Sequence, residues 1–260
     1  VSRRGNGDTG TLPSRNPSIS ADGRFVVFES EATELVPNMD ENETTDVFLH
    51  DRDLDGNGVF DDYLENETVA TALISTGAGV GPSADGPSMN PVISADGGAI
   101  VFETRASNYV PDMVLDVTTD IVMLDRDPDG DGDLGNDVDL RVLISVSTAG
   151  EPGEHFEQAP AVSANGRIVA FHSPSTTLDP DDTNGSFYDV FVRNRDPDGN
   201  GLVDEGNATT TLVSKNTAGE AGDRGGQFPS VSGDGRWIAF ESNSTNLGDA
   251  APPPGMSQRV

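Results

Sequence analysis

Three stretches of the chain carry carboxylate and amide side chains at alternate positions around glycines. They read DRDLDGNGVFDD from Asp51, DRDPDGDGDLGND from Asp125 and NRDPDGNGLVDEG from Asn194. Like charges this close together repel one another unless a cation lies among them. Alternating oxygen side chains followed by a glycine form the first half of a calcium loop, in which a bidentate Glu normally completes the ligand set at the twelfth position. The three stretches therefore predict calcium binding.

The loops fit two registers, and the residues alone do not decide between them. In the register that starts at Asp53, Gly58 falls at the sharp turn, but Leu64 stands where the bidentate Glu belongs. In the register that starts at Asp51, Asp62 falls at that last position. Across the three loops the candidate ligands are Asp51, Asp53, Asp55, Asn57, Asp61, Asp62, Asp125, Asp127, Asp129, Asp131, Asp137, Asn194, Asp196, Asp198, Asn200, Asp204 and Glu205.

We expect about three Ca²⁺ ions, one for each loop, because Ca²⁺ takes six to eight oxygen ligands. Mg²⁺ fits less well, since it gives up its bound waters reluctantly. The expected role is structural, because an ion would hold together a long hairpin of like charges. The alternative is that the Asp-Gly and Asn-Gly steps serve only as turn formers.

The acidic stretches recur because the chain is built from a repeat. NPSISADGRFVVFES begins at Asn16, NPVISADGGAIVFET at Asn90, APAVSANGRIVAFHS at Ala159 and FPSVSGDGRWIAFES at Phe228. Each complete unit contains four short segments rich in Val, Ile and Phe, and turn residues bound each segment. The Asp-Gly step after the first segment favours a tight hairpin. The sequence thus predicts an all-β fold with four antiparallel strands in each unit.

Repeated four-stranded units are typical of β-propeller blades, which stack because one blade cannot bury both of its faces. We predict one domain over residues 1–260 with about four blades, from units of about 16–89, 90–158, 159–227 and 228–260, the last completed by 1–15. PSISADGRFVVFES and TTDVFLHDRD resemble the TolB-like, WD-repeat-like β-propeller repeat of many secreted bacterial proteins. The resemblance implies the fold and little about activity, because this fold hosts binding proteins, enzymes and scaffolds.

The repeat is split between the two ends of the chain. The fourth unit has its first two strands, ending near Glu241, and no clear third strand follows. SQRV at the C-terminus and VSRR at the N-terminus would together form one last strand. Three interpretations stay open. The ends meet within one molecule and close a ring, the end of one molecule completes the blade of the next in a polymer, or the sequence is a piece cut from a longer propeller.

Composition excludes several classes of partner. The formal charge is −30, from 45 acidic and 15 basic residues, so the chain offers no basic surface to nucleic acid or to an anionic membrane. Cysteine is absent, which excludes disulfides and thiolate chemistry. No apolar run approaches the roughly 18 residues of a membrane span. We expect a secreted protein, extracellular or attached to the cell surface.

No catalytic constellation is recognisable, and we predict that the protein is not an enzyme. His172 stands where the other units have Glu29, Glu103 and Glu241, and we interpret this position as structural, bonding the adjacent blade. The predicted function is structural or adhesive, as a filament or matrix subunit that associates with itself through terminal strands. Two hypotheses compete with it. One is a propeller that binds a glycan, peptide or protein ligand through its loops, and the other is a fragment of a secreted hydrolase or lyase.

Overall fold

The chain is an all-β protein. A computed structural model describes residues 9–36, 39–61, 70–77, 83–111, 118–134 and 138–248. These residues form three four-stranded antiparallel sheets and one two-stranded sheet. The predicted fold class is confirmed, and we call the sheets blades 1 to 4 in chain order.

The strands follow the sequence repeat, and within each blade every strand pairs with the next one along the chain. Blade 1 contains β1 (Ser14–Ile19), β2 (Phe25–Ser30), β3 (Asp46–Asp51) and β4 (Ala70–Leu73). Blade 2 contains β5 (Ser88–Ile93), β6 (Ala99–Thr104), β7 (Asp120–Asp125) and β8 (Leu140–Leu143). Blade 3 contains β9 (Gln158–Val162), β10 (Ile168–Ser173), β11 (Asp189–Asn194) and β12 (Thr209–Leu212). Blade 4 contains β13 (Gln227–Val231) and β14 (Ile238–Glu241), and one short 3₁₀ helix, η1 (Thr33–Leu35), follows β2.

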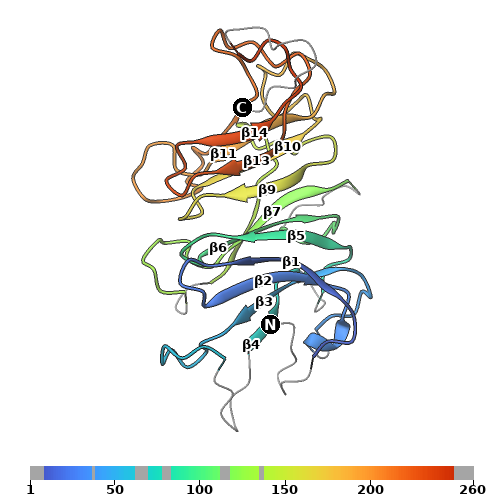
Figure 1. Cartoon of the computed structure of the whole chain (residues 1–260), viewed down its shortest axis with the longest axis vertical. Coiled ribbons are helices and arrows are strands. Elements are labelled where there is room, and N and C mark those ends of the chain that lie inside the picture. Colours follow the sequence, from blue (N-terminus) through green and yellow to red (C-terminus); the bar gives the residue numbers. More distant parts are fainter. Residues whose placement is uncertain are drawn as a thin grey trace.

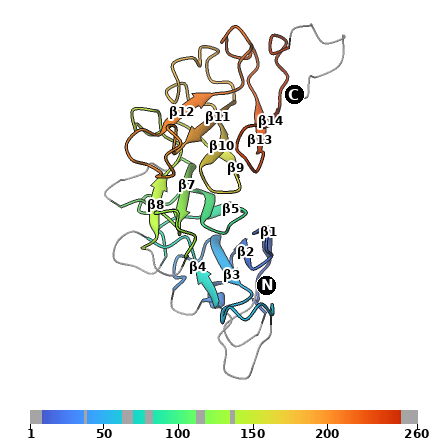
Figure 2. The ribbon, with the colours of Figure 1, turned by 90° about the vertical axis from the view of Figure 1, so that its left-hand side faces the viewer.

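The blades stand in a row along the longest axis of the molecule, with blade 1 at one end and blade 4 at the other (Figure 1). The first strands β1, β5, β9 and β13 contact one another in succession. Figure 2 shows these strands toward one side of the row and the fourth strands β4, β8 and β12 toward the other. The described strands therefore do not close a ring within one chain.

A hydrogen-bonded turn joins the first two strands of each blade. In blade 1 the Ser20 hydroxyl accepts the amide of Phe25 at 3.0 Å and donates to Asp22 at 2.6 Å. The Asp22 carboxylate also accepts the amide of Arg24 at 3.0 Å. Gly23 has a φ of +78°, which a residue without a Cβ adopts freely. The Asp-Gly hairpins predicted from the sequence are therefore present.

A side chain in each second strand holds the first strand of the next blade. The amide of Asn90 donates to Glu29 Oε2 at 2.7 Å, and the amide of Ala159 donates to Glu103 Oε1 at 2.9 Å. In blade 3 the acceptor is His172 Nδ1, which lies 3.0 Å from the amide of Phe228. Burial lowers the pKa of His172 to about 4, so the ring is neutral and accepts this bond. The interpretation of this position as a bond to the adjacent blade is confirmed.

The apolar core lies between the blades. One cluster joins Phe25 and Val27 of blade 1 to Ile93 and Phe102 of blade 2. A second cluster joins blade 2 to blade 3 through side chains of β6, β7, β10 and β11. Burial of apolar area contributes about 25 cal/mol per Å², so each blade depends on its neighbour for much of its stability.

Glycines in the hairpin turns let successive blades approach closely. Gly97 of blade 2 lies against Phe25 of blade 1, where an added methyl group would lie 2.6 Å from the Phe25 ring. Gly166 meets Ala99 and Gly235 meets Ile168 in the same way, again at 2.6 Å. Glycine at this position of the turn thus allows both the positive φ and the close contact between blades.

We expect Gly97→Ala to destabilise the protein more than Gly150→Ala. Both glycines have a φ near +85°, but only at Gly97 would a methyl group meet a neighbouring blade. The backbone strain costs about 1–2 kcal/mol at either position, and overpacking adds about 1–3 kcal/mol at Gly97. Urea denaturation monitored by circular dichroism measures the difference. Equal losses in the two variants would contradict the close packing of the turn.

The fourth repeat unit contributes two strands to the described residues, as the sequence predicts. The terminal segments that we expect to form one shared strand, within residues 1–8 and 249–260, lie outside the described residues. Among the described residues no helix is long and apolar enough to cross a membrane.

Candidate metal centre

The three acidic stretches form equivalent loops between the third and fourth strands of blades 1, 2 and 3. We call them acidic loop 1 (residues 51–62), acidic loop 2 (residues 125–137) and acidic loop 3 (residues 194–206). Two of the predicted ligands, Asp62 and Asp137, lie outside the described residues.

An aspartate near the start of each acidic loop fixes its turn. Asp53 accepts the amide of Gly58, five positions later, at 3.0 Å, so the carboxylate closes the turn between them. Asp127 and Asp196 accept the amides of the equivalent glycines, each at 3.1 Å. The same geometry in all three loops shows that the alternating pattern encodes one backbone shape.

The residue two positions earlier supports this aspartate. Asp51 accepts the amide of Asp53 at 3.0 Å, and Asp125 accepts that of Asp127 at 3.1 Å. Asn194 does the same for Asp196 at 3.1 Å. These side chains end strands β3, β7 and β11, so the sheets set the starting point of each loop.

Arginine side chains neutralise several of the predicted ligands. Arg24 donates two hydrogen bonds to Asp51, at 2.9 and 2.8 Å, and so engages both carboxylate oxygens. Arg52 donates two bonds to Asp61, at 3.0 and 2.7 Å. The Arg24–Asp51 pair is bidentate, whereas both Arg52 bonds go to the same oxygen, Asp61 Oδ2. Charge-assisted bonds of this kind reduce the charge left for a cation.

Acidic loop 2 brings together three carboxylates. Oxygens of Asp127, Asp129 and Asp131 all lie within 4.8 Å of one another, with Asp127 half-buried and the other two exposed. Such a group of three is found only here among the described ranges. A set of hard oxygen ligands on one tight loop could hold a metal ion of the Ca²⁺ class.

The other two acidic loops have an asparagine at the third alternating position. Asn57 donates its amide to Asp55 at 2.7 Å. Asn200 donates to Asp198 at 3.3 Å and to Glu205 at 2.8 Å. In both loops the amide group satisfies a carboxylate that would otherwise repel its neighbours.

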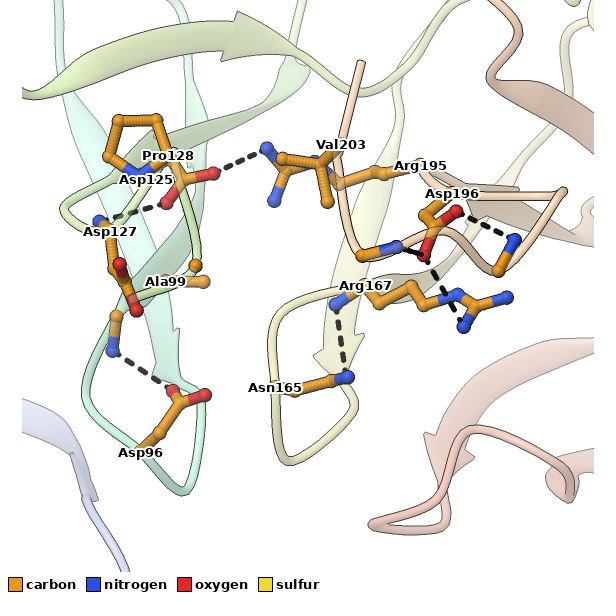
Figure 3. Close-up of a pocket in the computed structure, with 14 residues that line it drawn as sticks. Asp96, Ala99, Asp125, Asp127, Pro128, Asn165, Arg167, Arg195, Asp196 and Val203 are labelled. Atoms are coloured by element: carbon orange, nitrogen blue, oxygen red, sulfur yellow. Dashed lines mark hydrogen bonds and ion pairs between the residues drawn. The ribbon is translucent and has the colours of Figure 1, made fainter. Parts of the chain in front are cut away.

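A cavity of about 310 Å³ separates acidic loops 2 and 3. Figure 3 shows Asp127 on one wall, Asp196 and Arg167 on the other, and Arg195 extending toward Asp125. Arg167 Nη1 lies 3.5 Å from Asp196 Oδ2. The cavity is thus lined by both signs of charge.

Arg195 ties blade 3 to blade 2. Its guanidinium donates to Asp125 of blade 2 at 2.5 Å and to Asp204 of its own loop at 2.8 Å. Another nitrogen donates to the carbonyl of Gly166 at 3.2 Å. Burial lowers the pKa of Arg195, but the charges of Asp204 and Asp125 outweigh this and raise it, so the side chain stays charged. Sequence reasoning missed this contact, because Arg195 and Asp125 are 70 residues apart.

The geometry defines an all-β protein of blade-like sheets with an oxygen-rich centre at acidic loop 2. No protein-family model matches the chain, and no curated protein matches it in sequence.

Solved structures similar to the chain include β-propeller proteins. TolB from Acinetobacter baumannii matches with a TM-score of 0.45 and 15% identity, over 90% of this chain and 39% of that one. A putative TolB from Agrobacterium tumefaciens matches with a TM-score of 0.43 and 15% identity, over 89% of this chain and 55% of that one. The sialidase of Trypanosoma rangeli, in complex with the inhibitor DANA, matches with a TM-score of 0.43 and 13% identity, over 96% and 40%. The chain thus spans roughly 40–55% of the length of these structures.

We expect Arg195→Leu to destabilise the protein by about 3–5 kcal/mol, because it leaves Asp125 and Asp204 near the interior without a counter-charge. Arg24→Leu removes a similar pair from a more exposed site and is expected to cost about 1 kcal/mol or less. Urea denaturation of both variants provides the comparison. Equal losses of unfolding free energy in the two variants would show that Arg195 contributes no more to stability than the exposed Arg24 does.

Proposed function

We propose that this protein is a calcium-binding β-propeller with a structural or adhesive role outside the cell, and that it associates with itself. The observation that carries the proposal is the carboxylate triad of acidic loop 2, on a backbone turn that the other two acidic loops share. The register that starts at Asp53, Asp127 and Asp196 has support, because Arg24 already engages both oxygens of Asp51.

A structural role suits the position of the loops. The acidic loops join strands within a blade, and Arg195 links acidic loop 3 to the end of strand β7. A bound cation would reduce repulsion within a chain of formal charge −30 and would hold each loop in one shape. The secreted location remains part of the proposal, as extracellular Ca²⁺ binding is typical of modules with modest affinity.

Calcium titration of the 260-residue chain tests the metal centre. We expect binding in isothermal titration calorimetry and a higher Tm in calcium than in excess chelator, because an ion bound only by the folded state stabilises it. Asp129→Asn should weaken the affinity of acidic loop 2 by roughly 10-fold or more, since it removes one charged ligand.

Glu154→Gln is the matched control, because it removes one exposed negative charge away from the acidic loops. It should bind calcium as the wild type does. An Asp129→Asn variant with unchanged calcium affinity would refute acidic loop 2 as a metal centre.

Self-association is supported by two faces that no other blade covers among the described residues. Trp237 of blade 4 occupies the position of Phe25 and Ile168, which the next blade contacts, yet Trp237 is 70% exposed. Ile19 of blade 1 occupies the position of Ile93, which is buried against the preceding blade, yet it is 54% exposed. The two faces lie at opposite ends of the row (Figure 1), so a second copy could place its Ile19 face on the Trp237 face of the first.

Complementation of two variants tests this association. Ile19→Lys and Trp237→Lys each place a charge on one of the two apolar faces, so each variant alone should be monomeric in sedimentation velocity. The wild type should form larger species. A mixture of the two should form a 1:1 dimer and stop there, because it retains one intact pair of faces. Val138→Lys, at an exposed position outside both faces, is the control and should behave as the wild type does. A monomeric wild type and a mixture that does not associate would refute the proposal.

A cavity among the first strands favours ligand binding as the second candidate function. Its volume is about 630 Å³, within the usual range for small-ligand sites. Glu103 and His172 supply polar groups to its wall, and Tyr188 and Phe228 supply aromatic rings. A glycan or a peptide is the ligand class we propose for this alternative.

A further inference from the structure

The third strands of blades 1 and 3 each begin with a fully buried aspartate that is held in the same way. Asp46 Oδ1 accepts the Ser75 hydroxyl at 2.5 Å, and Ser75 in turn accepts the amide of Val47 at 3.0 Å. Asp189 Oδ1 accepts the Ser214 hydroxyl at 2.5 Å, and Ser214 accepts an amide at 3.0 Å. These aspartates start strands β3 and β11, whereas the acidic loops follow the ends of the same strands.

The loop that leads into each of these strands carries an Asp-x-Asn sequence. We call these lead-in loop 1 (residues 39–45) and lead-in loop 3 (residues 181–188). The Asn42 side-chain amide donates to the carbonyl of Ala84 at 2.9 Å. The Asn184 amide donates to the equivalent carbonyl, that of Gly222, at 2.6 Å, and to Asp189 at 2.7 Å. Both lead-in loops are therefore fixed against the connection to the next blade.

Each lead-in loop buries carboxylate oxygens that lack a well-formed hydrogen bond in the part of the chain that the structure describes. Asp40 is 6% exposed and Asp182 is 7% exposed. Among the described residues neither oxygen of either carboxylate accepts a hydrogen bond of normal geometry, and the nearby donors are the backbone amides of Asn42 for Asp40 and of Asn184 for Asp182. Lead-in loop 1 adds Asp46 Oδ2 to this set, and lead-in loop 3 adds Asn184 Oδ1. Buried polar atoms nearly always have a hydrogen-bond partner. Three such oxygens in each of two equivalent loops therefore point to a missing partner.

The carboxylates around these oxygens favour a positive partner. Asp46 and Asp182 are both buried, and no Arg or Lys of the described residues forms an ion pair with either of them. Asp40 lies beside Asp46, and Asp189 lies beside Asp182, so each place gathers two carboxylates. An ionised carboxylate without a counter-charge in such a place is costly.

We propose that lead-in loops 1 and 3 are a second set of cation sites, each holding one Ca²⁺ ion. In lead-in loop 1 the ligands are both oxygens of Asp40 and Asp46 Oδ2, and in lead-in loop 3 they are both oxygens of Asp182 and Asn184 Oδ1. Carbonyl and carboxylate oxygens select a hard cation, and Ca²⁺ accepts bidentate carboxylates in irregular geometry.

Blade 2 retains part of the same arrangement. Asp120 starts β7 and accepts the Ser145 hydroxyl at 3.2 Å, and Ser145 accepts the amide of Ile121 at 3.1 Å. The segment that would supply its other ligands falls in residues 112–117, outside the described residues. The proposal is therefore confined to blades 1 and 3.

The test compares wild type with the double variant Asp40→Asn/Asp182→Asn by thermal unfolding in excess chelator and again in millimolar calcium. In chelator we expect the variant to melt at the same temperature as the wild type or higher, because it removes two buried, unpaired charges. In calcium we expect it to melt several degrees lower, because it has lost two ion sites. This change of sign separates a cation site from a residue that merely supports the fold.

Glu41→Gln is the matched control, since it removes an exposed carboxylate next to Asp40 and should follow the wild type in both conditions. Asp129→Asn tests acidic loop 2 separately and leaves the lead-in loops intact, so either set of sites can fail without the other. A double variant that shifts Tm equally in calcium and in chelator, or that retains wild-type calcium stoichiometry, would overturn the proposal.

Discussion

The contact between successive blades is the constraint on which the rest of the structure depends. A blade of four short strands is too small to bury its own apolar side chains, so the core forms between blades. Three kinds of interaction recur at this contact. A turn glycine packs on the second strand of the preceding blade, an acceptor side chain takes the amide of the following first strand, and apolar side chains fill the space between. Because the contact is repeated, a substitution at one blade contact tests the role of the equivalent residues at the others.

Repulsion between negative charges is the second constraint, and the carboxylates at the two ends of the third strands have different partners. At the end of β3, Asp51 has Arg24 beside it, and at the end of β7, Asp125 has Arg195 from the next blade. At the start of β3, Asp46 and Asp40 are buried, and no described Arg or Lys forms an ion pair with them. Arginine therefore neutralises the carboxylates at the end of these strands. At their start the carboxylates are bound by hydroxyl groups and, in our proposal, by a cation.

Much of the fold could be predicted from the sequence, because the repeat places hydrophobic runs and Asp-Gly turns in the same order in each unit. The position and the turn shape of the acidic loops were equally accessible, since they depend on residues within five positions of one another, such as Asp53 and Gly58. The partners of those loops were not. Asp51 meets Arg24 from the turn before β2, and Asp125 meets Arg195 from another blade, so both contacts depend on strand and blade pairing that a local pattern does not contain.

The buried carboxylates were inaccessible to sequence reasoning for a different reason. Asp40 and Asp182 look like solvated loop acids, in sequences that read MDEN and DDTN. Their burial follows from the way Asn42 and Asn184 fasten the loops to the connection with the next blade. Packing between blades thus creates a place where a carboxylate cannot reach water, and a cation bound there would favour the packed state over the unfolded chain. On this view the ion and the blade contact stabilise each other, because each one needs the geometry that the other maintains.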